Sequence, residues 1–217
     1  MLWIKRLIFT VALLPIAIFQ AHSEDYQAGV HYEVLPQAVR TADPSKIEVN
    51  EIFSYTCGHC YTFEDAVEPW IETLPADVDF QRTPAIWSPA LEPYARAYYA
   101  ALMLDALHKV HTPIFEAIHL KKERFSSEQD FAEVFAAAGV DGQKFSKAYN
   151  SFGMTSMVNQ AKARVRSYRT QGTPEIIVNG KYRVSTRNTG GFSGMLSVAE
   201  FLIQKERAQL SPTNPVR

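Results

Sequence analysis

The stretch "SYTCGHCYTF", residues 54–63, contains the only two cysteines among the 217 residues of the chain. Cys57 and Cys60 are separated by Gly58 and His59, so they form a Cys-x-x-Cys motif. Such a pair is compatible with a structural disulfide, half of a metal site, a haem attachment point or a redox-active dithiol. The residues around the motif distinguish among these four interpretations.

The beginning of the chain has the pattern of a secretory signal peptide. Residues 5–6 are basic, residues 7–19 are mostly apolar, and residues 21–23 ("AHS") offer small side chains for cleavage. The apolar run is shorter than the roughly 20 residues that a membrane-spanning helix needs. We therefore expect cleavage after Ser23 and an exported, mature chain of residues 24–217.

The mature chain is weakly acidic. The full sequence has 22 basic and 23 acidic residues, and removal of residues 1–23 takes away two basic residues and no acidic ones, which leaves a net charge of −3 (20 minus 23). This charge argues against a nucleic-acid or anionic-membrane partner, because both need a basic surface. A mature chain of 194 residues (217 minus 23) is long enough for one domain, with or without an insertion, whose core needs no disulfide framework.

Strand patterns flank the motif. Residues 47–55 ("IEVNEIFSY") are rich in β-branched and aromatic residues and predict a central strand that runs directly into Cys57. Residues 26–35 predict a short leading strand, and residues 77–83 alternate like a second core strand. Between them, residues 61–74 have apolar side chains at helical spacing. The motif is therefore expected where a strand ends and a helix begins.

The segment of residues 91–169 shows no convincing strand pattern. It predicts about five helices, over residues 91–107, 110–120, 126–138, 141–149 and 155–168. Strand patterns return at residues 175–178 and 182–185, and the Asn-Gly pair between them is a strong hairpin signal. A last amphipathic helix is predicted over residues 193–207.

A Cys-x-x-Cys pair at the start of a helix suits redox chemistry. Residues i and i+3 of a helix lie on one face, so the two sulfurs can close a disulfide. Cys57 is expected beside unpaired backbone N–H groups and the positive end of the helix dipole, which lower its pKa and favour the reactive thiolate. His59 adds a nearby donor or positive charge, and Cys60, one turn further, is expected to be the less exposed, resolving thiol.

The other interpretations of the motif find little support. Zinc needs two further ligands, and the remaining histidines form no second metal-binding pair; His108 and His111 are interpreted as surface or partly packed side chains. Haem attachment requires a histidine directly after the second cysteine, where Tyr61 stands. We therefore predict no metal and no bound cofactor, and the redox-active disulfide Cys57–Cys60 is the expected reactive group.

Three features together resemble the DsbA family of thioredoxin-fold oxidoreductases: "TCGHC" after a strand, the helical block, and "GTPEIIVNGKYRV" at residues 172–184. The resemblance covers nearly the whole mature chain and implies an α/β, thioredoxin-like fold with an inserted all-helical subdomain. The expected segments are a signal peptide at residues 1–23, a first thioredoxin-like part at 24–86, a helical insertion at 87–169, a second thioredoxin-like part at 170–208 and a flexible tail at 209–217.

The resemblance also implies roles for residues outside the motif. A cis-proline opposite the Cys-x-x-Cys lines the active site of such proteins, and Pro174, after Thr173, is the matching position; these two residues are expected to hold the substrate backbone. Glu51, six residues before Cys57, matches a buried carboxylate that assists proton transfer from the resolving cysteine. Arg82, on the second predicted strand, is its expected cationic partner.

As a member of this family, the protein would be a periplasmic thiol:disulfide oxidoreductase. It would donate the Cys57–Cys60 disulfide to reduced exported proteins and be reoxidised by a quinone-linked membrane partner of the DsbB kind. We expect a monomer, because only 33 residues (24–56) separate the signal peptide from Cys57, whereas dedicated bacterial isomerases carry an N-terminal dimerisation domain.

One departure from the family pattern leaves alternatives open. The best-known members carry Pro-His between the cysteines, whereas Gly58-His59 resembles protein disulfide isomerase. An isomerase or reductase kept reduced by another partner is therefore an alternative. A non-catalytic peptide-binding module and a glutathione-using enzyme of the same fold are further alternatives, although retention of both cysteines speaks against them.

Overall fold

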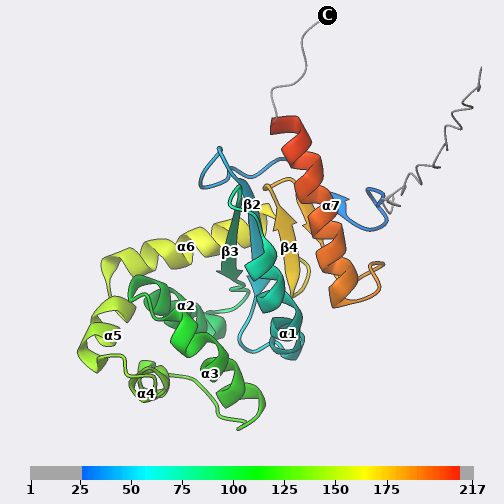
Figure 1. Ribbon diagram of the computed structural model, residues 1–217. Helices are drawn as coiled ribbons and strands as arrows, with labels where there is room; N and C mark the ends of the chain where they lie inside the picture. Colours follow the sequence, from blue (N-terminus) through cyan, green and yellow to red (C-terminus); the bar gives the residue numbers. More distant parts are fainter. Residues whose placement is uncertain (1–25, 211–217) are drawn as a thin grey trace, which may run out of the picture.

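The computed structural model describes residues 26–210, in which a mixed sheet has helices on both faces (Figure 1). The strands of the sheet are β1 (Glu33–Val34), β2 (Ile47–Phe53), β3 (Val78–Pro84), β4 (Glu175–Val178) and β5 (Tyr182–Val184). Their spatial order is β1-β5-β4-β2-β3, with β2 parallel to β3 and the other neighbours antiparallel. β2, which leads to the cysteines, is thus an interior strand, and all seven of its residues are buried.

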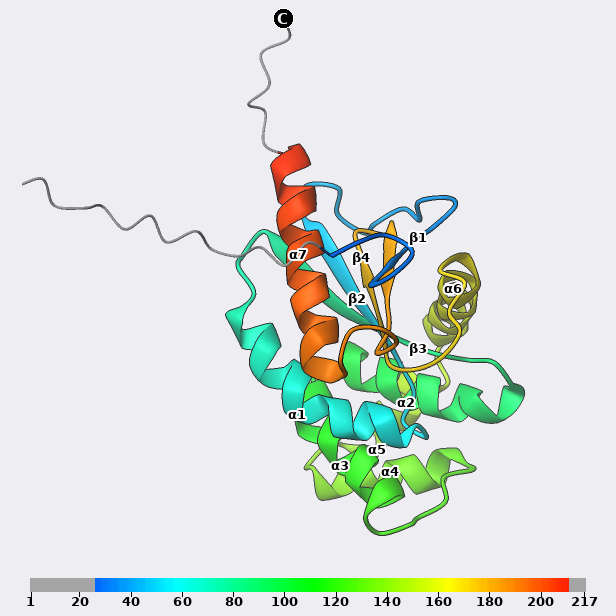
Figure 2. The same cartoon turned by 90° about the vertical axis from the view of Figure 1, so that its right-hand side faces the viewer.

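Two helices cover one face of the sheet and a third covers the other (Figure 2). α1 (Gly58–Thr73) and α7 (Phe192–Leu210) pack on the face that carries Val49 and Ile176, whereas α6 (Phe152–Ser167) packs on the face that carries Ile52 and Ile177. Because successive strand residues point to opposite faces, β2 and β4 contribute apolar side chains to both layers. None of the helices between residues 26 and 210 is long and apolar enough to cross a bilayer.

A helical subdomain lies between β3 and β4 in the sequence. It contains a 3-10 turn η1 (Pro89–Leu91) and the helices α2 (Glu92–Met103), α3 (Leu107–His119), α4 (Glu128–Ala137), α5 (Gly142–Tyr149) and the first half of α6. Its core is rich in buried aromatic residues, among them Phe115, Phe131 and Phe145. Phe53 and Cys60 belong to the same buried cluster, so this core is continuous with the end of β2 and the start of α1.

Most of the predicted elements are present, and the differences lie at their ends. The leading strand is confined to β1, because Gly29 adopts a positive φ of 80° in a turn and only two residues pair with β5. α3 begins at Leu107, three residues earlier than predicted, and α6 begins at Phe152, where the Ser151 side chain accepts a hydrogen bond from the Met154 N–H. Such an N-cap fixes the start of a helix more firmly than the apolar periodicity indicates.

The predicted hairpin between β4 and β5 is confirmed. Asn179 and Gly180 both have positive φ, 49° and 61°. A Cβ at Gly180 would lie 2.0 Å from the Val39 carbonyl oxygen, so only glycine fits at this position.

The predictions for the two ends of the chain have different outcomes. The predicted signal peptide and residues 211–217 lie outside the described residues. The predicted boundary of the C-terminal tail at residue 209 is wrong, because α7 continues through Leu210.

Candidate active site

Cys57 lies at the junction between β2 and α1. β2 ends at Phe53, and α1 begins at Gly58, which makes Cys57 the N-cap residue of the helix. Its backbone is extended (φ −92°, ψ 116°), and its N–H donates to the Ser54 carbonyl oxygen at 3.0 Å. A cysteine at a position that usually holds Ser, Thr, Asp or Asn leaves the first-turn N–H groups free to interact with its sulfur.

Hydrogen bonds to the sulfur lower the pKa of Cys57 from 9.0 to about 5. The largest contribution comes from the Cys60 thiol; burial opposes it, and the Thr173 side chain and the backbone N–H groups of Cys60 and His59 lower the pKa further. With such a pKa, about 99 % of the thiol is thiolate at pH 7. Because Cys57 is also partly exposed, it is a nucleophile that another protein can reach.

Cys60 has the opposite character. It is fully buried, in the same core cluster as Phe53, Tyr55 and Phe115. Burial, together with its hydrogen bond to Cys57 and the charge of that sulfur, raises the pKa of the Cys60 thiol far above its ordinary value. The two free thiols therefore hold opposite protonation states at neutral pH, as expected for an attacking thiolate and a resolving thiol.

The loop between α6 and β4 lies against Cys57. The Thr173–Pro174 peptide bond is cis, and the Thr173 carbonyl oxygen lies 3.3 Å from the Cys57 sulfur. The structure thus brings together the two cysteines and the predicted proline, although 114 positions separate Cys60 from Pro174. The substrate-binding role of Thr173 and Pro174 stays a prediction.

The dipeptide between the cysteines is exposed. Gly58 and His59 both lie at the surface, and His59 acts on Cys57 through its backbone N–H. A polypeptide that approaches Cys57 would therefore meet these two residues first.

A histidine of the helical subdomain also reaches the site. A Cβ at Gly58 would lie 4.0 Å from the Nδ1 and Cε1 atoms of His119, at the end of α3. His119 is fixed there by a 2.8 Å contact between its Nε2 and the Tyr55 carbonyl oxygen and by stacking on Tyr61, with ring centroids 5.2 Å apart. The sequence gives no local signal for this placement, because it depends on how α3 packs against α1.

Glu51 lies on β2 in a completely buried position. Its Oε2 accepts a 2.8 Å hydrogen bond from Arg82 Nε, so the expected ion pair is present. Arg82 also approaches Glu68 at 2.6 Å and Glu64 at 3.5 Å. Burial, only partly offset by Arg82, raises the pKa of Glu51 to about 7, and the charge of Glu51 in turn raises the pKa of Cys60. A carboxyl group with this pKa can exchange a proton at neutral pH.

Glu64 is a further buried carboxyl beside Arg82, and it was not predicted from the sequence. It lies on α1, one turn after Cys60, and its pKa is raised to about 7 mainly by burial. A signal was available, because Glu64 interrupts the apolar face of α1 between Phe63 and Val67, and a carboxylate on such a face needs a partner.

His111 is buried beside this group, so its interpretation as a surface or partly packed side chain is wrong. The Tyr55 hydroxyl is 2.7 Å from its Nδ1, and its Nε2 is 3.5 Å from Glu64 Oε2. Burial lowers the pKa of His111 to about 3, so the imidazole is neutral at pH 7. A Tyr55 hydroxyl that donates to Nδ1 places the imidazole proton on Nε2, which makes no hydrogen bond to any described residue.

The side chains of Glu64, Glu68 and His111 also place possible ligand atoms within 4.8 Å of one another. The Arg82 guanidinium, however, lies 2.6 Å from Glu68 and 3.5 Å from Glu64. It already supplies the positive charge that a cation would bring, and it would repel a metal ion at that position. This cluster is therefore better suited to an ion-pair network than to a metal site.

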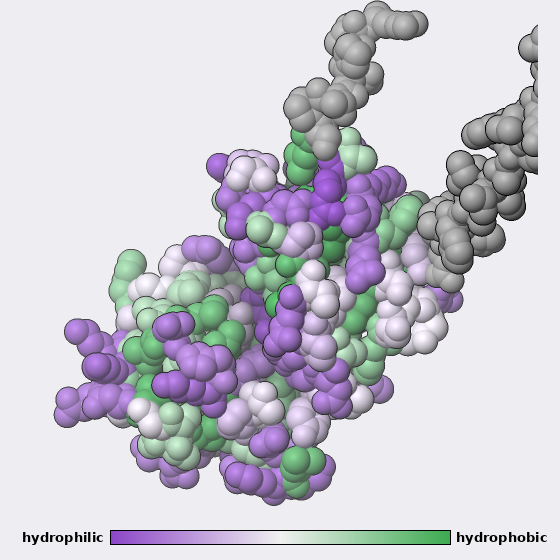
Figure 3. Space-filling model, in the orientation of Figure 1, coloured by the Kyte–Doolittle hydropathy of each residue, from purple (hydrophilic) through white to green (hydrophobic). Residues whose placement is uncertain are grey.

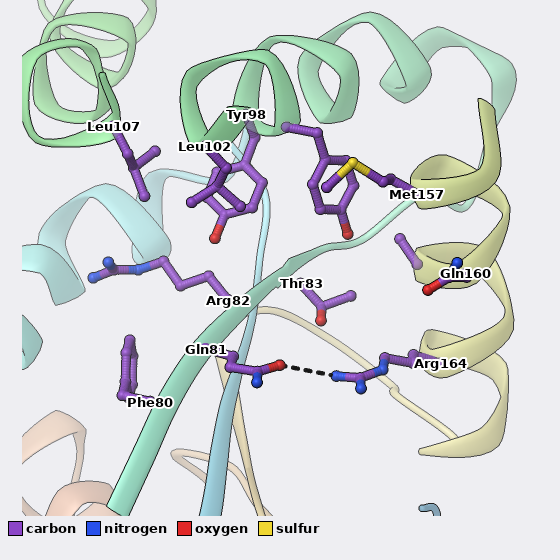
Figure 4. Close-up of a pocket in the computed structure, with 12 residues that line it drawn as sticks. Phe80, Gln81, Arg82, Thr83, Tyr98, Leu102, Leu107, Met157, Gln160 and Arg164 are labelled. Carbon is purple, nitrogen blue, oxygen red and sulfur yellow. Dashed lines mark hydrogen bonds between the residues drawn. The ribbon is translucent and has the colours of Figure 1, made fainter. Parts of the chain in front are cut away.

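A cavity of about 380 Å³ lies between β3, α2 and α6 (Figure 4). Tyr98, Met157 and Arg164 line it, and Arg164 donates to Gln81 at 3.2 Å. Neither cysteine lines this cavity, whereas Arg82 does. The cavity is thus separate from the sulfurs, and its link to the site is the cationic partner of Glu51.

Comparison with known proteins agrees with this geometry. The model of the DSBA-like thioredoxin domain family matches residues 48–198. The chain belongs to this family. The thiol:disulfide interchange protein DsbA of Pseudomonas aeruginosa is 38% identical over 206 residues, which cover 94% of this chain and 98% of the relative. The protein of the same name from Azotobacter vinelandii is 37% identical over 211 residues, with 94% and 99% coverage.

Solved DsbA structures share the fold. The crystal structure of Pseudomonas aeruginosa DsbA matches with a TM-score of 0.83 and 39% identity, covering 86% of this chain and 97% of that one. The oxidoreductase DsbA of Xylella fastidiosa matches with a TM-score of 0.79 and 34% identity, with 84% and 98% coverage. The protein is therefore a thiol:disulfide oxidoreductase with a thioredoxin-like α/β fold and a helical insertion.

Proposed function

We propose that this DSBA-like protein is a periplasmic disulfide donor, which transfers the Cys57–Cys60 disulfide to reduced, newly exported proteins. The observation that carries the proposal is the partly exposed Cys57 at the N-terminus of α1, where hydrogen bonds to the sulfur lower its pKa to about 5 and stabilise the thiolate. A thiolate that is stable only in the reduced protein favours reduction of the disulfide, so the disulfide is a good oxidant. Each tenfold preference corresponds to about 30 mV for this two-electron couple.

The first step joins substrate and enzyme. A substrate thiolate attacks Cys57 Sγ, the Cys57–Cys60 bond breaks, and its electron pair leaves with the Cys60 sulfur. The partial exposure of Cys57 and the burial of Cys60 support attack at Cys57. Cys60 then takes up a proton, because its pKa is raised far above neutral pH, and the nearby Glu51 carboxyl, with a pKa of about 7, is suited to supply it.

The second step releases the product. A second substrate thiolate attacks the substrate sulfur of the mixed disulfide, which forms the substrate disulfide and releases Cys57 as a thiolate. The low pKa of Cys57 makes it a good leaving group. The substrate has lost two electrons and the enzyme holds a Cys57 thiolate and a Cys60 thiol. The Thr173 main chain, next to Cys57, is suited to bind the substrate backbone during both steps.

The sequence and the family support the proposed location and partners. The signal-peptide pattern of residues 1–23 supports export, and the family supports the periplasm as the destination. Hydrophobic residues interspersed with hydrophilic ones over the helical subdomain suit contact with unfolded polypeptides (Figure 3). We further propose that the protein acts as a monomer and is reoxidised by a quinone-linked membrane protein of the DsbB kind.

The equilibrium redox potential of the cysteine pair, measured against glutathione buffers, tests the proposal. A value near −120 mV, as in the strongly oxidising member of this family, would support a dedicated disulfide donor. A value near −180 mV, as in protein disulfide isomerase, would favour the second candidate, an isomerase, which the Gly58-His59 dipeptide suggests. A value below about −250 mV would overturn the proposal in favour of a reductase, since thioredoxin lies near −270 mV.

A further inference from the structure

The loop that carries Thr173 and Pro174 lies between the active site and a second cavity. On the active-site side, the Thr173 carbonyl oxygen contacts the Cys57 sulfur at 3.3 Å. Residues 171–175 also line a second cavity, of about 360 Å³, together with residues 29–33 before and in β1, Arg183 in β5, and residues 185–188 after β5. Cys57 does not line this cavity. A loop that borders an empty volume lacks packed side chains on that side, so other contacts must fix its position.

The Glu175 side chain makes such a contact. Glu175 is the first residue of β4 and is 3 % exposed. Its Oε1 accepts a 3.2 Å hydrogen bond from the backbone N–H of Gln171, and the backbone N–H of Gly172 also interacts with the carboxyl group. The carboxyl group thus reaches back to the start of the loop and holds its main chain.

The position of Glu175 in the sheet explains this geometry. Glu175 pairs with Ile52 of β2, and it precedes Ile176, which packs with α1 and α7. Successive strand residues point to opposite faces, so the Glu175 side chain lies on the face of α6. Beyond the end of α6, this face borders the loop and the second cavity, which Glu175 lines.

Burial of this carboxyl group is costly for the fold. Burial raises the pKa of Glu175 to about 7, and the Gln171 hydrogen bond and the charge of Arg183 only partly oppose the rise. Arg183 itself pairs with Glu33 at 2.6 Å, and Glu175 Oε2 has no hydrogen-bond partner among residues 26–210. An apolar side chain of similar size would avoid the cost, which indicates that the carboxyl group serves something other than stability.

We propose that Glu175 is a positioning residue for disulfide exchange: its carboxyl group holds the main chain at Gln171 and Gly172 and thereby keeps Thr173 and Pro174 beside Cys57. This inference rests on the thiol:disulfide exchange activity of the family. It assigns to Glu175 no contact with the reacting sulfurs.

The test compares two substitutions of similar size. Glu175→Leu removes the hydrogen-bond acceptor, and Glu175→Gln keeps one. With oxidised protein and a dithiol peptide, we expect Glu175→Leu to raise KM about tenfold, the effect of one lost hydrogen bond to a charged group, with kcat changed less. Glu175→Gln is expected to stay within about threefold of the wild-type KM. Arg187→Gln, a change at an exposed residue that lines the same cavity, is the matched control and is expected to leave KM unchanged.

A structural role alone predicts a different pattern. If Glu175 only supported the fold, Glu175→Leu would change the thermal midpoint and leave the KM of the folded protein at the wild-type value, which would overturn the proposal. A Glu175→Gln protein as impaired as Glu175→Leu would overturn it too, because the proposal assigns the effect to the acceptor oxygen. If the wild-type protein fails to oxidise the peptide, the proposed donor function is wrong, and the same variants are then compared in insulin reduction, where the loop has the same role.

Discussion

The active site has two parts, here called the mouth and the floor, and the pKa of the thiol in each part is shifted by a different cause. The mouth is the group around the attacking sulfur, formed by the half-buried Cys57 and Thr173, the exposed Gly58 and His59, and the buried Pro174. The floor is the buried group of titratable side chains beneath it, formed by Cys60, Glu51, Arg82, Glu64 and His111. Hydrogen bonds, the largest of them to the Cys60 thiol, lower the pKa of Cys57 at the mouth, whereas burial raises the pKa of Cys60, Glu51 and Glu64 in the floor. One helical turn therefore separates a thiolate from a thiol.

Replacement of either cysteine by serine should have the largest effect on disulfide exchange and should distinguish the roles of the mouth and the floor. Cys57→Ser removes the partly exposed thiol and leaves only the buried one, so we expect loss of all exchange activity in insulin reduction. Cys60→Ser keeps a Cys57 thiolate that can attack a substrate disulfide and displace one of its sulfurs as a thiolate, but it lacks the second thiol that would release the substrate from the mixed disulfide. We therefore expect mixed disulfides to accumulate, visible as adducts on non-reducing gels and in mass spectra.

The double variant Cys57→Ser/Cys60→Ser is the control for adducts that do not involve the site. Adducts on Cys57→Ser in place of Cys60→Ser would mean that the buried sulfur is the one attacked, and the assignment of mouth and floor would be reversed.

Removal of the cation from the floor should have the next largest effect. Arg82→Met leaves Glu51 and Glu64 buried without their partner, and we expect the free energy of unfolding to fall by about 3–5 kcal/mol at pH 8. Both carboxyls already have a pKa of about 7, above the 4.5 of an unfolded glutamate, and loss of Arg82 raises them further. The folded variant thus binds more protons than its unfolded chain. The loss of unfolding free energy caused by Arg82→Met should therefore become smaller as the pH falls from 8 to 5. Urea unfolding at both pH values measures it.

Arg164→Met is the matched control for this measurement. Arg164 lines the same cavity as Arg82, but it is partly exposed and lies 3.4 Å from Glu48. Glu48 is buried, but it keeps the hydrogen bonds from the Ala42 N–H and the Tyr168 hydroxyl when Arg164 is replaced, so this variant should lose at most about 1 kcal/mol of unfolding free energy. Equal losses of unfolding free energy in the two variants would show that the ion pairs of Arg82 in the floor stabilise the fold no more than the ion pair of the partly exposed Arg164.

The mouth could be predicted from the sequence more fully than the floor. Cys57, Gly58 and His59 are adjacent, and a strand that runs into a helix suffices to place Cys57 at a helix N-terminus. Pro174 is distant in the sequence, and the family resemblance supplied its position. These residues can be recognised from adjacent sequence or from the family motif. The structure shows the Thr173–Pro174 peptide bond next to the Cys57 sulfur.

The floor depends on elements that only the fold brings together. Glu64 comes from α1, Arg82 from β3 and His111 from α3, and none of the three segments alone indicates the other two. His111 looked like an ordinary surface histidine because the apolar pattern of its helix does not reveal which face meets β2. Burial and partners, which decide its charge, are properties of tertiary packing.

The smallest predicted effect concerns the first residue of the dipeptide at the mouth. Proline at position 58 suits the structure, because Gly58 is the first residue of α1 and the extended backbone of Cys57 is what proline requires of its predecessor. A Cβ there makes only an ordinary 4.0 Å contact with His119, and the N–H groups that act on Cys57 belong to His59 and Cys60. Gly58→Pro therefore removes no donor to the sulfur.

The proline ring would hold the first turn of α1, and with it these donors, more rigidly around Cys57. We expect Gly58→Pro to raise the redox potential by about 30 mV, a tenfold change in the equilibrium with glutathione, and to stabilise the protein by at most about 1 kcal/mol. Gly58→Ala, which adds the contact with His119 without the ring, should change the potential less. An unchanged or more negative potential in Gly58→Pro would show that the floor, and not the order of the first helical turn, sets the strength of the oxidant.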